Sequence, residues 1–279
     1  PAAFTLAELG PGRGTLMADL LRATRAVPGF HAAATVVLVE ASATLRAVQR
    51  RTLGDHPVTW ADRVEALPDA PLFLIANEFF DALPIRQFTR HPQGWAETMV
   101  GVADGALTLG RSAPAPLAAL DHRLADTAPG DVVELCPAAA PITAAIATRI
   151  ARHGGAAIVI DYGDWRSRGD TFQALRHHRF ADPLAEPGLA DLTAHVDFDA
   201  IARAAHPARA SRMIPQGTLL TRLGIQQRSA RLADRLTDAP LAAHLSATRR
   251  LTDPAEMGSL FKALAIVPPQ AAAPPGFDL

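Results

Sequence analysis

Residues 4–21 read FTLAELGPGRGTLMADLL and combine an apolar run, a glycine-rich turn and a helical pattern. The apolar run Phe4–Leu9 predicts a buried strand, and apolar residues recur at helical spacing from Thr15 to Arg22. Glycines two apart between a strand and a helix let the backbone approach a bound nucleoside closely. The amides that open the helix favour a carboxylate or a phosphate in front of them. This stretch therefore predicts the first unit of an α/β fold that binds a nucleoside.

The alternation of strands and helices continues along the chain. We expect strands at Thr35–Glu40, Pro57–Asp62, Pro71–Ala76 and Ala156–Ile160, and helices at Thr44–Leu53 and Pro141–Arg152. Such alternation indicates βαβ units, and continuous apolar strands indicate a mostly parallel sheet with helices on both faces. The sequence therefore predicts an α/β, Rossmann-like fold with β-hairpin and loop insertions.

The predicted elements divide the chain into four parts. We predict a cofactor-binding half at 1–86, an insertion at 87–135, the remainder of the domain at 136–267 and a flexible tail at 268–279. The insertion holds a β-hairpin, Trp95–Val100 and Ala106–Leu109, followed by a connector rich in Pro and Ala. Residues 164–193 are polar and punctuated by Pro and Gly, which predicts a long loop on the substrate side. The chain begins without Met and almost at once on a strand, so we expect an upstream segment to be missing.

Composition narrows the class of protein. The 279 residues suffice for a full core, and 49% of them are hydrophobic. A net charge of −1 argues against bulk attraction to nucleic acid or an anionic membrane. The single cysteine, Cys136, excludes an internal disulfide, the histidines form no metal-ligand cluster, and no apolar run reaches the ~18–20 residues of a membrane span. We expect a cytoplasmic enzyme without metal; its oligomeric state stays open, with a homodimer as one option.

The candidates for cofactor binding lie at or near the ends of the predicted strands. They are Glu8, Gly10, Pro11, Gly12, Gly14, Glu40, Asp62 and Asn77. Because parallel strands end at one edge of the sheet, we expect these groups to converge. The G-x-G-x-G spacing with an acid two residues ahead favours S-adenosylmethionine (SAM), whose ammonium an acid can hold, over the G-x-G-x-x-G of dinucleotide enzymes. Glu40 suits two ribose hydroxyls, as an acid does in NAD sites too, and Asp62 suits the adenine amino group.

The run Asn77-Glu78-Phe79-Phe80-Asp81-Ala82-Leu83-Pro84 carries unusual polarity after the fourth predicted strand. A helical turn would place the carboxylates of Glu78 and Asp81 on one side. Paired carboxylates can hold a guanidinium, which stays protonated because its pKa exceeds about 12. The alternative is a turn whose acids cap the next helix. Asp161 and Tyr162 follow the fifth strand at the same edge, and His195 is a further candidate, either structural or catalytic.

These motifs together resemble the MidA family of class I SAM-dependent methyltransferases. The matching runs are, in order, residues 8–17, 77–84, 161–163, 169–174, 191–198 and 257–262. The resemblance implies a Rossmann-like class I methyltransferase fold, with SAM against Gly10–Gly14 and Glu40. It also implies an arginine acceptor near Glu78, Asp81 and Asp161, with Tyr162 and His195 on the substrate side.

The resemblance further implies a protein partner. Mitochondrial members of the family are protein-arginine methyltransferases that assist the assembly of respiratory complex I. The expected substrate is therefore a complex I subunit or a related bacterial protein, in the mitochondrial matrix or the bacterial cytoplasm. Family members normally carry an upstream segment, with a Gly-Asp-Phe and a Pro-Glu stretch, that packs over the pocket and that this sequence lacks.

Other functions stay open at this stage. One is a SAM-binding assembly factor with little turnover, and another is a methyltransferase acting on a small molecule or on another protein. The glycine spacing disfavours a dinucleotide oxidoreductase.

Overall fold

A computed structural model describes residues 2–177 and 179–279. The strands of its central sheet are β1 (Phe4–Leu9), β2 (Ala34–Val39), β3 (Val58–Ala61), β4 (Leu72–Asn77), β9 (Gly155–Asp164), β13 (Val196–Asp197), β14 (Arg209–Ala210), β15 (Ile214–Pro215) and β16 (Phe261–Val267). Their order is β14-β16-β9-β4-β1-β2-β3, with β13 beside β9 and β15 beside β16. Strands β1 to β4 and β9 are parallel, whereas β16 is antiparallel to β9. The chain reverses its direction of winding between β1 and β4, which is where ligands bind in such sheets.

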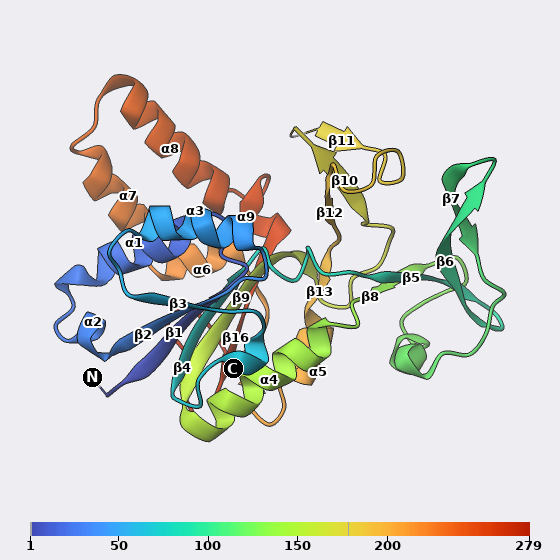
Figure 1. Cartoon of the computed structure of the whole chain (residues 1–279), viewed down its shortest axis with the longest axis horizontal. Helices are drawn as coiled ribbons and strands as arrows, with labels where there is room; N and C mark the ends of the chain where they lie inside the picture. Colours follow the sequence, from blue (N-terminus) through green and yellow to red (C-terminus); the bar gives the residue numbers. More distant parts are fainter. Residues whose placement is uncertain (1, 178) are drawn as a thin grey trace.

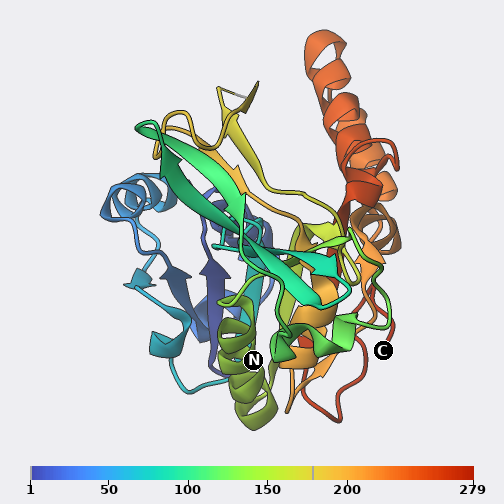
Figure 2. The same ribbon diagram turned by 90° about the vertical axis from the view of Figure 1, so that its right-hand side faces the viewer.

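Helices cover both faces of this sheet (Figure 1). One face carries α1 (Thr15–Ala23), α3 (Ala43–Leu53) and α6 (Gln216–Arg222), and the other carries α4 (Ala139–His153) and α5 (Phe198–Ala204). The pair α7 (Ile225–Ala233) and α8 (Asp238–Thr252) projects from the body (Figure 2). The short helices are α2 (Phe30–Ala33), α9 (Met257–Leu260), η1 (Thr24–Ala26), η2 (Val64–Ala66) and η3 (Ala118–Arg123). The predicted α/β, Rossmann-like architecture is confirmed.

The core lies on both sides of the parallel strands. Leu9 and Leu74 pack towards Ile146 of α4 on one face, and Leu6 packs towards Met17 of α1 on the other. All six residues of β1 are buried, as expected for a central strand covered on both faces. Burying one such aliphatic side chain contributes about 1.5–3 kcal/mol. The polar residues at the strand ends therefore lie at the edge of a sheet whose strands are packed on both faces.

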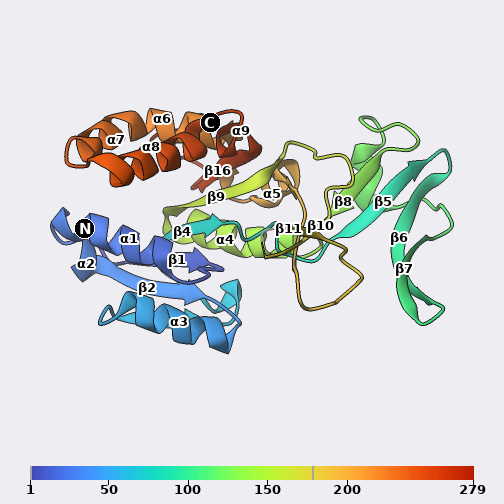
Figure 3. The ribbon, with the colours of Figure 1, turned by 90° about the horizontal axis from the view of Figure 1, so that it is seen from above.

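A second sheet occupies the region predicted as an insertion. Its strands, in the order β7-β6-β5-β8, are β5 (Arg86–His91), β6 (Gly94–Ala103), β7 (Ala106–Arg111) and β8 (Val132–Leu135). The predicted hairpin is present as β6 and β7, and β5 and β8 extend it. Phe88, Trp95, Leu120 and Val133 give this sheet a small core of its own. Figure 3 shows it at the end of the molecule opposite α1 to α3. The division of the chain into parts stays a prediction.

The expectation of a long loop at 164–193 is wrong. This segment contains a three-stranded sheet, β11-β10-β12, made of β10 (Gln173–Arg176), β11 (Arg179–Ala181) and β12 (Asp191–Thr193). Ala174 is buried and lies opposite Leu192 in the antiparallel register of β10 and β12. Short strands with few apolar residues leave no period in the sequence, and tertiary pairing decides their structure.

The tail at 268–279, for which we predict flexibility, packs against the domain near its end. Phe277 is buried in a cluster with Leu219 of α6 and Ala263 of β16. The Asp278 carboxylate pairs with Arg222 at 2.8 Å. One aromatic anchor thus fixes a Pro- and Ala-rich segment whose composition favours disorder.

Candidate functional site

The polar strand ends converge at the carboxyl edge of the parallel strands. Leu9, the last residue of β1, lies between Val39 of β2 and Ala76 of β4 in the register. Groups that follow these residues therefore share one edge. A cavity of about 270 Å³ opens there between Gly10, Glu40 and Phe79.

The glycine loop leaves β1 in a conformation suited to a close ligand. Gly10, Gly12 and Gly14 have φ of 55°, 53° and 79°, which side chains rarely tolerate. A Cβ on Gly10 would lie 2.9 Å from the Phe79 ring. The Gly14 amide donates to the Pro11 carbonyl at 2.7 Å, which closes the turn. Among the described residues no side chain caps α1 at Gly14, so the amides of Thr15 and Leu16 are available to a ligand, whereas that of Met17 faces Glu8.

Glu8 supplies a buried acid beneath this loop. Its side chain is 4% exposed, and its Oε2 has no hydrogen-bond partner in the described part of the chain. Burial raises the pKa of Glu8 to about 7, and the nearby Met17 amide offsets part of that effect. A buried oxygen without a partner is costly unless a ligand satisfies it. The glycine cradle and this orphaned oxygen fit the methionine end of SAM, with its positively charged ammonium.

Glu40 is held by a network that the sequence analysis did not predict. Its carboxylate accepts from the Ser42 amide at 2.8 Å and from Gln49 Nε2 at 3.1 Å. The same Gln49 nitrogen donates to the Gly12 carbonyl at 2.8 Å, and Trp60 Nε1 donates to Gln49 Oε1 at 2.8 Å. Gln49 thus ties the glycine loop to Glu40 and to β3.

The sequence contains an indication that Gln49 is buried. It is fully buried on α3, four residues after Leu45 and four before Leu53. A polar residue on the apolar face of a predicted helix needs a buried partner. In this chain the available partners are the groups at the nearby strand ends.

Asp62 lines the cavity beside Val64, yet most of its side chain faces solvent. Its carboxylate pairs with Arg46 at 2.6 Å, and Arg46 Nε also donates to the Glu40 carbonyl at 2.7 Å. Asp62 therefore orders the rim of the nucleoside cavity. Its direct contact with adenine stays a prediction.

The turn after β4 presents the acids expected at the acceptor side. Glu78 has a left-handed backbone, with φ of 50°, which costs a residue with a side chain about 1–2 kcal/mol. Asn77 Nδ2 donates to Glu78 Oε1 at 3.4 Å. Partial burial and the charge of Asp81 raise the pKa of the Glu78 carboxyl. The surrounding structure thus maintains a strained turn that holds two acids next to the cofactor loop.

Asp81 is the most distinctive of these acids. It is 5% exposed, its Oδ2 accepts from the Tyr162 hydroxyl, and its Oδ1 has no partner among the described residues. Burial raises the pKa of Asp81, and the Tyr162 hydrogen bond opposes that rise. A buried oxygen without a partner is costly unless a ligand supplies a hydrogen-bond donor to it.

Asp161 lies behind this turn rather than in the open site. It is fully buried, and its Oδ2 accepts from the amides of Phe80 and Asp81 at 3.0 and 3.3 Å. Its Oδ1 accepts from the Tyr162 amide at 3.1 Å. Burial, together with the charge of Asp81, raises the pKa of Asp161 to about 8. Through these contacts Asp161 clamps β9 to the turn that follows β4.

His195 stands beside Tyr162, with ring centroids 5.5 Å apart in an edge-to-face arrangement. Its amide donates to Thr171 Oγ1 at 2.8 Å, and burial lowers the pKa of its imidazole. A neutral ring in this position supports the Tyr162 side chain.

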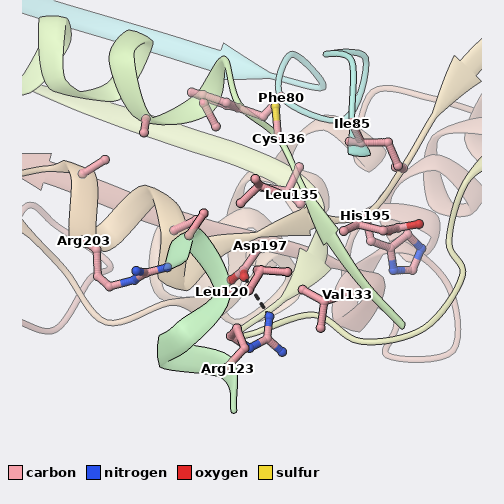
Figure 4. A pocket seen from close by; sticks show the side chains of 18 of the residues that line it. Phe80, Ile85, Leu120, Arg123, Val133, Leu135, Cys136, His195, Asp197 and Arg203 are labelled. Atoms are coloured by element: carbon pink, nitrogen blue, oxygen red, sulfur yellow. Dashed lines mark hydrogen bonds and ion pairs between the residues drawn. The ribbon is translucent and has the colours of Figure 1, made fainter. Parts of the chain in front are cut away.

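A second cavity, of about 320 Å³, is lined by Phe80 and His195 among others (Figure 4). This cavity lies between the insertion on one side and α4 and α5 on the other. Its charged groups are satisfied internally, because buried Arg123 pairs with Asp197 at 3.4 Å and Arg203 pairs with Asp199 at 3.1 Å. Within residues 2–177 and 179–279, no cluster of three or more His, Cys, Asp or Glu side chains could hold a metal ion.

The fold and the cofactor cradle define a SAM-dependent methyltransferase of the Rossmann-like class. Residues 1–215 match the family described as S-adenosyl-L-methionine-dependent methyltransferase, and the chain belongs to that family. The resemblance drawn from the motifs is confirmed, and the cofactor is SAM. None of the helices in the described residues is long and apolar enough to cross a membrane.

Known relatives agree with this assignment. The mitochondrial protein arginine methyltransferase NDUFAF7 of Homo sapiens is 35% identical over 295 residues, which cover 96% of this chain and 67% of the relative. The Bos taurus protein of the same name is 34% identical over 296 residues, with the same coverage. A Burkholderia thailandensis protein crystallised with S-adenosyl-homocysteine has a TM-score of 0.83 and 32% identity, covering 98% of this chain and 74% of that one.

Proposed function

We propose that this methyltransferase acts on arginine in a protein, with the guanidinium held by Asp81 and Glu78. The observation that carries the proposal is the buried Asp81 Oδ1, which has no partner in the described residues. A guanidinium presents a planar fork of N–H donors that matches a carboxylate. The relatives named protein arginine methyltransferase support the same acceptor.

The residues of this chain would prepare the acceptor in three ways. Tyr162 fixes one Asp81 oxygen, which leaves the other aimed at the guanidinium. Asp161 holds the amides of the acceptor turn and so sets the position of Asp81 relative to the cofactor loop. Glu78 adds a second negative charge next to the same turn. Since methyl transfer is an in-line displacement, such positioning supplies much of the acceleration.

A carboxylate of the site would also accept the proton that the acceptor nitrogen loses. SAM, when bound, supplies a methyl group on a positively charged sulfur. Burial raises the pKa of Asp81, so its carboxylate is a stronger base than one in water. An ionised carboxylate hydrogen-bonded to the guanidinium can accept a proton as the nitrogen gains the methyl group.

We infer the identity of the substrate protein from the family resemblance. We propose a subunit of respiratory complex I, or a related bacterial protein, as the acceptor, in the mitochondrial matrix or the bacterial cytoplasm. A scaffold that binds SAM without turnover, and a methyltransferase for small molecules, are the alternatives that the experiment below distinguishes.

The test combines cofactor binding with labelled methyl transfer. Calorimetry should show binding of SAM and none of NAD. Transfer of labelled methyl to a complex I subunit should fall by about 10²–10³ in Asp81→Asn, because a charged contact in a buried site is lost, and by less in Glu78→Gln, because the Glu78 side chain is exposed. Asp104→Asn, an exposed acid in the hairpin turn, is the matched control and should retain full activity. Preferential NAD binding, or unchanged transfer in both site variants, would contradict the proposal.

A further inference from the structure

A groove of about 350 Å³ leads away from Asp81 between the two smaller sheets. Val100 and Leu109 of the β6–β7 hairpin line one side, and Leu192 of β12 with Phe172 lines the other. Both sheets lie beyond the carboxyl ends of β4 and β9 (Figure 1). The groove therefore connects the acceptor acid with the surface of the molecule.

One face of the hairpin is apolar although solvent reaches it. In the antiparallel register Val100 lies opposite Leu109, and Val102 lies opposite Leu107, so the four side chains share a face. They are between 39% and 72% exposed. Leu192, across the groove, is 44% exposed. Apolar side chains gathered on one exposed face indicate a surface that binds another molecule.

The charge of the groove is concentrated at one end. Its charged lining residues are Asp81, Arg86 and Glu97. Arg86 and Glu97 neutralise each other through two hydrogen bonds of 2.6 and 2.7 Å. The remaining charge is that of Asp81, whose buried Oδ1 lacks a partner in the described chain. A ligand that complements this groove is cationic at the Asp81 end and apolar beyond it.

We propose that the groove binds an extended segment of the substrate protein, with its arginine at Asp81 and an aliphatic or aromatic neighbour between Val100 and Leu192. This inference rests on the proposed arginine methyltransferase activity and adds its sequence preference. The segment can also pair with β12, which is an edge strand of its sheet in the described residues. The hairpin and β12 thus select the sequence around the arginine, while Asp81 selects the arginine itself.

Binding of synthetic peptides tests the groove without requiring turnover. The probes are fluorescent peptides with one arginine flanked by Leu or Phe, measured in the presence of S-adenosylhomocysteine. Val100→Asp and Leu192→Asp, on opposite walls, should each weaken binding about tenfold or more, because an apolar contact is replaced by a buried charge. Val27→Asp is the matched control: Val27 is an exposed apolar residue that does not line the groove, and this variant should bind as the wild type does.

Methyl transfer then separates the two proposals. N-acetylarginine methylamide lacks flanking side chains, so both groove variants should methylate it at the wild-type rate, while their KM for the peptides rises. No binding of any flanked peptide, or equal binding by the wild type and both groove variants, would refute the proposal that the groove binds the substrate segment. Peptide binding that is sensitive to Val100→Asp, without any methyl transfer, would support the groove and refute the arginine methyltransferase activity.

Discussion

Replacing Glu8 with Gln measures the cost of burying an acid beneath the glycine loop. Burial raises the pKa of Glu8 from 4.5 to about 7. Because the folded-state pKa is the higher one, Glu8 adds stability that is fully present below pH 4.5 and is lost as the pH rises through about 7. At about 1.36 kcal/mol per pKa unit, the whole contribution is ~3 kcal/mol. Of this, ~2 kcal/mol disappears between about pH 5.5 and about pH 8.5.

Chemical denaturation of the cofactor-free protein at these two pH values gives the free energies of unfolding. The wild type should lose ~2 kcal/mol more than Glu8→Gln between them. Asp161, whose pKa burial raises to about 8, adds a pH slope to both proteins and cancels in the comparison. Asp55→Asn, at an exposed position, should keep the wild-type slope. Equal slopes in the wild type and Glu8→Gln would refute the reasoning.

Saturating SAM should remove much of this difference. The ammonium of the cofactor stabilises the ionised form of Glu8, so binding lowers its pKa and releases a proton near neutral pH. Calorimetry in buffers with different heats of ionisation measures that proton. Proton uptake on binding, in place of release, would contradict contact between Glu8 and the ammonium.

Three further predictions concern other parts of the molecule. Gln49→Glu should weaken SAM binding in calorimetry about tenfold or more, because a carboxylate would replace the amide that donates to Gly12 and Glu40; exposed Gln226→Glu should leave it unchanged. Tyr162→Phe should lower kcat about tenfold, leave SAM affinity unchanged and move the acid limb of the pH–rate profile to higher pH, because the hydrogen bond that lowers the pKa of Asp81 is lost; an unmoved acid limb would count against this role. Phe277→Ala should cost about 3 kcal/mol of unfolding free energy, whereas Phe180→Ala, 79% exposed, should cost almost none, and equal effects would show that the tail is not anchored.

The cofactor half could be predicted from sequence because its elements are local. Each βα unit between Phe4 and Asn77 shows its own period, and parallel strands bring their ends to one edge without further information. The prediction of β1 matches its observed bounds. The position of Asp161 at the carboxyl edge of the sheet could also be predicted, because Asp161 follows an apolar strand.

The role of Asp161 could not be predicted, because its partners are backbone amides. Whether a carboxylate at a strand end faces a ligand or clamps a turn depends on the register of β9 against β4. The paired strands at 173–193 escaped prediction for a related reason. Their few apolar residues become buried only when the segment packs against the turn, where the Ala194 amide donates to the Asp81 carbonyl at 3.0 Å.

The clamp from Asp161 to the acceptor turn joins positions about 80 residues apart in the chain. Translation at roughly 5–20 residues per second therefore separates the synthesis of the two partners by roughly 4–16 s. Apart from Ile142, the residues that line the nucleoside cavity are made before Asp81. During that interval the nascent chain carries its glycine loop but has an unpaired β4 edge and a turn after β4 without its clamp, and an unpaired strand edge is prone to pair with other chains.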